Sequence, residues 1–224
     1  MAKAFASQGD MAEKNVSFTE IGDGLYAFTA EGDPNSGVII GDNSVMIVEA
    51  QATPRLANKV IECVRSVTDK PITHLVMTHY HAVRVLGASA FNAPQVIMSE
   101  KARSMVVERG QEDWDSEFAR FPRLFQGHEE IPGLTWPTTT FNGRMSVYLG
   151  NRRVDIMQLG RAHTAGDAVV YVPDQNVMFT GDIVEYKSAC YCGDGHFHDW
   201  PDTIENIRAW EQDAIAPGRG DALI

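Results

Sequence analysis

Two histidines separated by one residue, His79 and His81, follow directly after an apolar run and are the residues best suited to chemistry. A third histidine, His163, and an aspartate, Asp182, also come shortly after apolar runs. Imidazole nitrogens and carboxylate oxygens are ligands that zinc and related divalent ions take in proteins. Because each group follows a segment that forms a rigid strand, the pattern predicts a metal site built from these four side chains.

The elements that must hold these ligands read mostly as strands. Apolar runs predict buried strands that end just before the candidate ligands, at residues 72–77, 154–158 and 177–180. Shorter runs punctuated by turn residues predict an antiparallel meander over residues 24–30, 37–40 and 45–49. Further strands are expected over residues 95–98, 145–149, 168–172 and 214–216.

Helices are expected between these strands. Thr53 followed by Pro54 is typical of a capped helix start, and apolar residues recur at helical spacing beyond it. Helical patterns return over residues 85–91, 100–126 and 203–210. Strand runs flanked by helices predict one layered α/β sandwich, and no linker divides the chain into two domains.

With these motifs in place, the chain resembles the metallo-β-lactamase superfamily of metallo-hydrolases from about Gly24 to Gly220. The family's His-x-His-x-Asp-His signature lies over His79, His81, Val83 and Arg84. Its next ligand histidine lies over His163, its bridging aspartate over Asp182, and its last ligand histidine over Arg219. The resemblance implies a four-layer αβ/βα sandwich with the metal centre at one edge, between two sheets.

Three positions depart from the family pattern, and all belong to its second metal site. Val83 carries no ligand atom, while Arg84 and Arg219 carry guanidinium groups that offer only donors and cannot bind a cation. The histidine triad of the first site is complete. We therefore expect one zinc ion on three imidazoles, with an open position for water, although iron or manganese would suit the same ligands.

Such a centre implies hydrolysis. A zinc ion on three imidazoles supplies hydroxide near neutral pH, which suits attack on a lactone, thioester, amide or β-lactam. We expect Asp182 to accept a hydrogen bond from water and to pair with Arg84 or Arg219, and the free arginine to hold a carboxylate or an oxyanion. The alternative is a non-catalytic metal- or ligand-binding relative. A phosphodiesterase or nuclease ranks third, because such enzymes usually use paired metals.

Several further residues have weaker signals. Glu49 ends a predicted strand and is a candidate to orient a ligand histidine. His196 and His198 lie in a glycine-containing loop after Asp182 and are candidate general acids, although a solvated loop is the simpler interpretation. Cys190 and Cys192 are expected to be structural rather than redox-active.

Composition limits the partners. The chain has 224 residues, with 19 Lys and Arg against 30 Asp and Glu, a net charge of −11 that disfavours nucleic-acid binding. No apolar run is long enough to span a membrane, and three cysteines do not form a disulfide framework. We expect a cytoplasmic protein that acts on a small molecule, as a monomer or a homodimer.

The expected domain runs from residue 16 to residue 224. The first 15 residues are expected to be a disordered leader. The chain stops four residues after Gly220, so we expect either a minimal member of the family or one whose C-terminal portion is absent.

Overall fold

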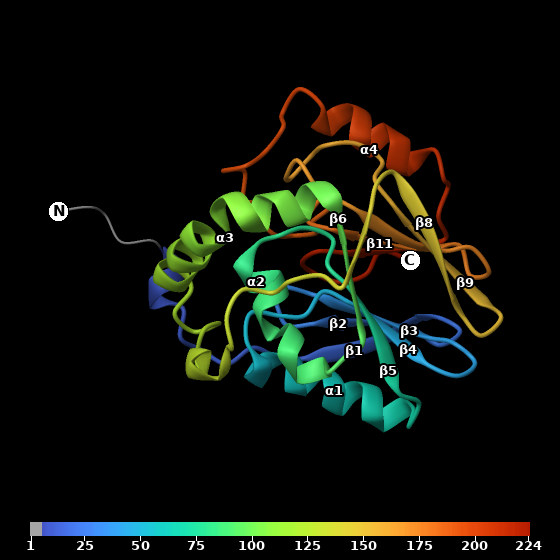
Figure 1. Ribbon diagram of the computed structural model, residues 1–224, viewed down its shortest axis with the longest axis horizontal. Helices are drawn as coiled ribbons and strands as arrows, with labels where there is room; N and C mark the ends of the chain where they lie inside the picture. Colours follow the sequence, from blue (N-terminus) through green and yellow to red (C-terminus); the bar gives the residue numbers. More distant parts are fainter. Residues whose placement is uncertain (1–5) are drawn as a thin grey trace.

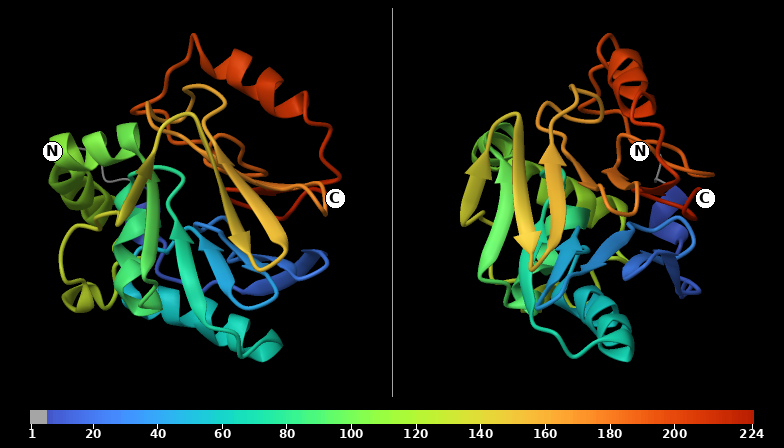
Figure 2. Two further views of the ribbon diagram at one scale, coloured as in Figure 1. Left: turned by 45° about the vertical axis from the view of Figure 1, so that its right-hand side comes forward. Right: turned by 90° about the vertical axis from the view of Figure 1, so that its right-hand side faces the viewer.

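Two β-sheets pack face to face with helices on their outer faces in the computed structural model, which describes residues 6–224 (Figure 1). The views in Figure 2 show the same four layers, with α1 (Pro54–Val67) against one sheet and α4 (Trp200–Arg208) against the other. The expected αβ/βα sandwich is therefore confirmed. Within the described residues, no helix is long and apolar enough to cross a membrane.

The first sheet contains seven strands in their order along the chain. The first four strands pair antiparallel, and β2 to β4 among them form the predicted meander. The last three strands continue the sheet parallel to β4. Their bounds are β1 Ser17–Gly22, β2 Leu25–Thr29, β3 Ser36–Ile40, β4 Val45–Val48, β5 Ile72–Val76, β6 Gln95–Ser99 and β7 Thr139–Phe141.

The second sheet contains five strands in the order β12-β11-β10-β9-β8. All pairs are antiparallel except β11 with β12, which run parallel. Their bounds are β8 Arg144–Leu149, β9 Arg152–Met157, β10 Val169–Val172, β11 Val177–Gly181 and β12 Ala214–Pro217.

Capping residues set where the longer helices begin. The Thr53 hydroxyl accepts from the Leu56 N–H at 3.3 Å, and the Ser99 hydroxyl accepts from the Ala102 N–H at 3.0 Å. The helices are α1 Pro54–Val67, α2 Ala82–Val85, α3 Glu100–Arg120 and α4 Trp200–Arg208, with 3₁₀ turns η1 Ala6–Gly9, η2 Leu86–Phe91 and η3 His128–Glu130.

The apolar core follows the layers. One buried cluster lies between α1–α3 and the first sheet, a second lies between the two sheets, and a third lies under α4. Where the sheets touch, a side chain at Gly37 would meet the Phe179 ring, since a Cβ there would lie 2.4 Å from it. The residue at this position must therefore lack a side chain for the two sheets to approach.

The structure differs from the predicted elements in several places, among them the last helix, α4, which begins and ends earlier than the predicted range 203–210. Strands β1 and β7 were not predicted, and α3 ends at Arg120 although the helical pattern extends to residue 126. In the described part of the expected leader, the Ser7 hydroxyl and the Gln8 amide donate to carbonyls at the end of α3 at 2.6 and 2.9 Å. Residues 1–5 of that leader lie outside the described residues.

Candidate metal centre

Strands from both sheets deliver the candidate ligands to one edge of the sandwich. His79 and His81 lie in the turn between β5 and α2, and His163 lies in the loop between β9 and β10. Asp182 immediately follows β11. The turn after β5 is tied to the second sheet, because the Ala168 N–H donates to the Thr78 carbonyl at 2.8 Å.

The three histidines form a compact trio. One ligand atom from each lies within 4.8 Å of the others. Their ring centroids are 4.8–4.9 Å apart and their planes cross at 82–88°, so each ring turns an edge toward the other two. His163 Nε2 lies 3.0 Å from His81 Nδ1. The side chains are only 1–3% exposed.

Neighbouring groups fix how two of these rings are presented. His81 Nε2 lies 2.9 Å from the Asp194 carboxylate, to which it donates, and this leaves a lone pair on His81 Nδ1. His79 Nδ1 lies 3.0 Å from the Thr78 hydroxyl. The Thr78 N–H in turn donates to Glu49 at 2.6 Å, so Glu49 orients the turn that carries His79 rather than the ring itself.

The backbone of Glu49 adopts a left-handed conformation that is unfavourable for a residue with a side chain. Glu49 is buried, its φ is +68°, and its second carboxylate oxygen has no hydrogen-bond partner among the described residues. Burial, opposed by the charge of Arg84, raises the pKa of Glu49 to about 7. The predicted orienting role therefore acts through Thr78.

This arrangement fits a divalent metal ion. His79 Nε2 is buried and has no hydrogen-bond partner among the described residues. Burial lowers the pKa of His163 to about 3 and that of His79 well below its ordinary value, so both rings are neutral and keep a lone pair for a metal. The donor set of His79, His81 and His163 is that of a three-histidine zinc site.

Asp182 lies between the trio and a buried arginine. Its Oδ2 atom is 3.6 Å from His79 Nε2 and 3.5 Å from His163 Nε2, and its Oδ1 atom pairs with the Arg84 guanidinium. Arg84 is completely buried and also donates to the Gly218 carbonyl at 2.7 Å. Burial alone would raise the pKa of Asp182, but Arg84 above all holds it well below its ordinary value.

Arg219, the other arginine near Asp182, has protein partners of its own. It donates to the Gly32 carbonyl at 2.9 Å, and its Nε atom lies 3.5 Å from the Glu185 carboxylate. Burial and the charge of Asp182 raise the pKa of Glu185 to about 7. Both arginines thus have protein partners, and the pairing of Asp182 is with Arg84. A catalytic role for either arginine stays a prediction.

Sequence reasoning placed Asp194 in the loop after Asp182, near the site, but gave it no role of its own. Besides His81, its carboxylate accepts from the Tyr80 hydroxyl at 2.5 Å and pairs with Arg109 of α3 at 2.7 Å. These contacts outweigh its burial and lower the pKa of Asp194 to about 2. The only signal in the chain was its place in the loop after Asp182.

The remaining candidates of that loop are two histidines and two cysteines. His196 uses its backbone N–H, which donates to the Ala162 carbonyl at 2.7 Å, and His198 is exposed. Cys190 and Cys192 are exposed free thiols. The role of either histidine as a general acid stays a prediction.

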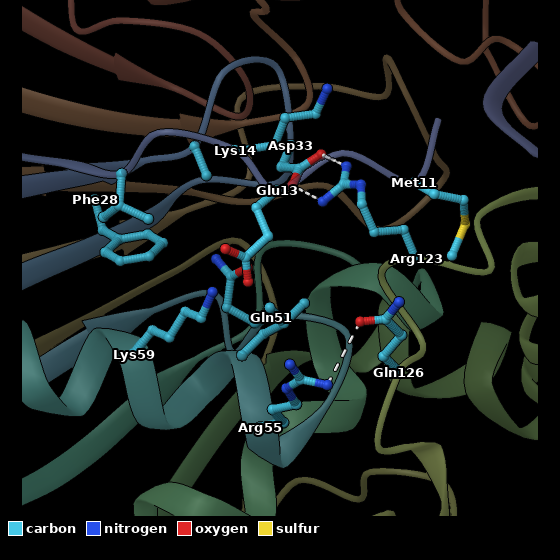
Figure 3. A pocket seen from close by; sticks show the side chains of 13 residues that line it. Met11, Glu13, Lys14, Phe28, Asp33, Gln51, Arg55, Lys59, Arg123 and Gln126 are labelled. Atoms are coloured by element: carbon cyan, nitrogen blue, oxygen red, sulfur yellow. Dashed lines mark hydrogen bonds and ion pairs between the residues drawn. The ribbon is translucent and has the colours of Figure 1, made fainter. Parts of the chain in front are cut away.

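A separate cavity of about 60 Å³ lies between the N-terminal segment and α1 (Figure 3). Arg55 and Lys59 of α1 line it together with Phe28, and Arg123 at its edge pairs with Asp33 at 2.5 Å. None of the three ligand histidines lines it.

Comparisons with known proteins agree with this geometry. The sequence profile described as "Metallo-beta-lactamase superfamily" matches residues 29–214. A metallo-beta-lactamase type 2 from Bacillus cereus is 26% identical over 215 residues, covering 93% of this chain and 74% of its own. The protein of the same name from Bacillus sp. (strain 170) is 26% identical over 214 residues, covering 92% and 74%.

Solved structures share the fold. The structure titled as a metallo-beta-lactamase from Pontibacter korlensis superposes with a TM-score of 0.75, at 17% identity, over 93% of each chain. The sequence match spans most of the chain, the fold agrees, and the histidine trio stands where the sequence motif placed it. On these grounds this protein belongs to the metallo-beta-lactamase superfamily.

Proposed function

We propose that this protein is a hydrolase that uses one zinc ion and acts on a carbonyl substrate. The observation that carries the proposal is the buried trio of His79, His81 and His163, whose rings turn edges toward one another beside an ion-paired Asp182. The coarser part, a metal-dependent hydrolase, follows from the family and the trio together.

The case for a single metal ion rests on what surrounds Asp182. Val83 is buried and has no ligand atom, and the Arg84 guanidinium is bound to Asp182 Oδ1 and to a backbone carbonyl. A guanidinium remains protonated, so it supplies fixed positive charge beside the carboxylate without binding a metal. A second ion would have to displace Arg84 and accept a site with Asp182 as its sole remaining ligand.

A zinc ion on three imidazoles activates water as a nucleophile near neutral pH. The residues of the chain hold the parts in place. Asp194 fixes the ring of His81, and Thr78, itself held by Glu49, supports His79. Asp182 Oδ2 is not bound to Arg84, so it is the oxygen available to orient a water molecule, and Arg84 keeps it ionised.

The substrate class is a small molecule with a susceptible carbonyl group. The names of the two Bacillus relatives make β-lactams the first compounds to assay, followed by lactones, thioesters and amides. The same assay separates the two candidate functions. Turnover that a chelator abolishes and zinc restores supports the hydrolase, whereas bound zinc without turnover on any of these compounds supports the non-catalytic alternative.

Metal content tests the stoichiometry. We expect one zinc per chain by elemental analysis, and none in His163→Ala. The control is His128→Ala, because the His128 side chain is 51% exposed and outside the trio. Two tightly bound ions in the unaltered protein would overturn the single-metal proposal.

A double substitution tests why the second ion is missing. Val83→Asp with Arg84→His restores two ligand types and removes the guanidinium, so zinc content should rise from one toward two per chain. A content that stays at one in a folded double variant would contradict the explanation based on these two residues.

A further inference from the structure

The three histidines are closed off from solvent. Their side chains are 1–3% exposed and that of Asp182 is 4% exposed. A catalytic zinc site must keep a position open for water and substrate. Some part of the cover over the trio therefore has to move during each cycle.

Three side chains of the segment after Asp182 lie against the trio. The ring of Tyr191 lies 5.5 Å from His81 and 6.3 Å from His163, centroid to centroid. The ring of Trp200 lies 6.0 Å from His163, and Asp194 is bonded to His81.

Two of these three are firmly held. Trp200 begins α4, and its indole N–H donates to the Ile183 carbonyl at 3.0 Å. Asp194 has contacts with His81, Tyr80 and Arg109. Both are suited to a fixed wall, because moving either one breaks hydrogen bonds at partly buried atoms.

Tyr191 is held much less firmly. It is 36% exposed, and the residues on either side, Cys190, Cys192 and Gly193, are exposed as well. Besides the histidine rings, the ring of Tyr191 lies against the Arg120 guanidinium, which is 4.4 Å from the ring centroid. A cation–π contact of this kind is weak enough to open and close readily.

The closed position of Tyr191 also depends on Gly193. A Cβ atom at Gly193 would lie 2.0 Å from the Tyr191 hydroxyl oxygen and 2.3 Å from the ring carbon that bears it. The ring thus folds back over a residue without a side chain. Any side chain there would push the ring away from its present place.

From these contacts we infer that Tyr191 is the gate of the metal centre and a specificity residue for substrate size. Opening means rotation of the ring away from Arg120, while Asp194 and Trp200 stay in place. A substrate with a bulky group beside its carbonyl needs the gate to open further than a small one does. This inference rests on the proposed function.

Metal exchange tests the gate without any hydrolysis assay. Zinc removal by an excess of a strong chelator should be about 2- to 30-fold faster in Tyr191→Ala and in Gly193→Ala, the factor that loss of one cation–π contact gives. Gly193→Ala is the sharper variant, because it leaves the tyrosine itself intact. The controls are Tyr148→Ala, an exposed residue of β8, and Gly9→Ala, which has nothing within 4 Å of its added methyl group.

A second readout needs no metal. In metal-free protein, diethyl pyrocarbonate should modify His81 and His163 faster in both gate variants than in the controls, as mapped by mass spectrometry. Unchanged rates of modification in either folded gate variant would overturn the inference. If zinc does not bind to the trio at all, the proposed function fails, and this labelling experiment still decides the gate.

Substrate size supplies the last comparison. In Tyr191→Ala, kcat/KM for a bulky thioester should rise relative to kcat/KM for a small one. An unchanged ratio would show that the ring does not select by size.

Discussion

The buried carboxylate of Asp182 lies between two different environments, the histidine trio and a pair of arginines. On one side, three imidazoles turn edges toward one another, and His79 Nε2 has no hydrogen-bond partner among the described residues. On the other side, Arg84 and Arg219 bring permanent positive charge and are bonded to protein oxygens. The histidine trio can therefore bind an added cation, whereas the arginine side already contains two positive charges.

This difference teaches that the charge beside Asp182 and the histidine trio are held by separate sets of contacts. Asp182 needs positive charge beside it because it is buried, and Arg84 provides that charge from within the chain. The trio does not depend on Arg84 for its geometry, because the contacts that orient His79 and His81 come from Thr78 and Asp194. The two sides should therefore respond separately to substitution.

The largest expected effect is on the arginine side. Arg84→Met should lower the free energy of unfolding of the metal-free protein by about 3–5 kcal/mol, because it leaves a buried carboxylate without its partner. Chemical denaturation measures this. The matched control is Arg208→Met, whose ion pair with Glu205 is exposed and is worth about 1 kcal/mol or less. An effect of Arg84→Met as small as that of the control would show that Asp182 does not need the charge of Arg84.

Acidity tests the histidine side of the metal-free protein. Because burial lowers the pKa of His163 to about 3, the unfolded chain binds a proton below about pH 6.5 that the folded chain rejects. Stability should therefore fall as pH drops from about 6.5 toward 3, by a few kcal/mol.

The variant His163→Gln isolates this contribution. It cannot titrate, so its stability should fall less steeply over the same pH range than that of the unaltered protein. Thermal unfolding followed at several pH values gives both curves. Parallel curves would mean that His163 is not buried in its neutral form.

A smaller effect is expected from the group that orients His81. Asp194→Asn keeps an oxygen that accepts from His81 Nε2 but removes the charge, and it should weaken zinc binding about 10- to 100-fold. Competition with a chelator of known affinity measures this. Asp199→Asn is the control, because Asp199 is 39% exposed and pairs with the exposed Arg161 in the same region. Equal affinity in the two variants would place Asp194 outside the metal centre.

Much of the fold was predictable because local signals agreed with the final packing. The apolar runs before His79 and Asp182 became β5 and β11, and the Thr53-Pro54 signal marks the start of α1. Strand β1 escaped prediction because it is mostly exposed, and β7 because it has only three residues. Short or solvated strands owe their conformation to neighbouring strands, which a local pattern does not contain.

The site was predictable to the extent that its ligands follow strands. The trio could be named, but the partner of Asp182 could not be chosen between Arg84 and Arg219, since that choice depends on how two distant loops pack. Asp194 is 113 residues from His81 along the chain, and nothing in the sequence ties the two together. Orienting contacts of this kind arise only when the tertiary structure forms.

The Arg84–Asp182 pair bears on whether the chain folds before or after it binds a metal ion. A domain whose buried carboxylates are neutralised only by metal ions must acquire those ions before it can fold. Here the guanidinium of Arg84 belongs to the polypeptide, so the charge of Asp182 is balanced without an added metal ion. We therefore expect the metal-free chain to fold, and a metal ion to bind afterwards to the preformed histidine trio.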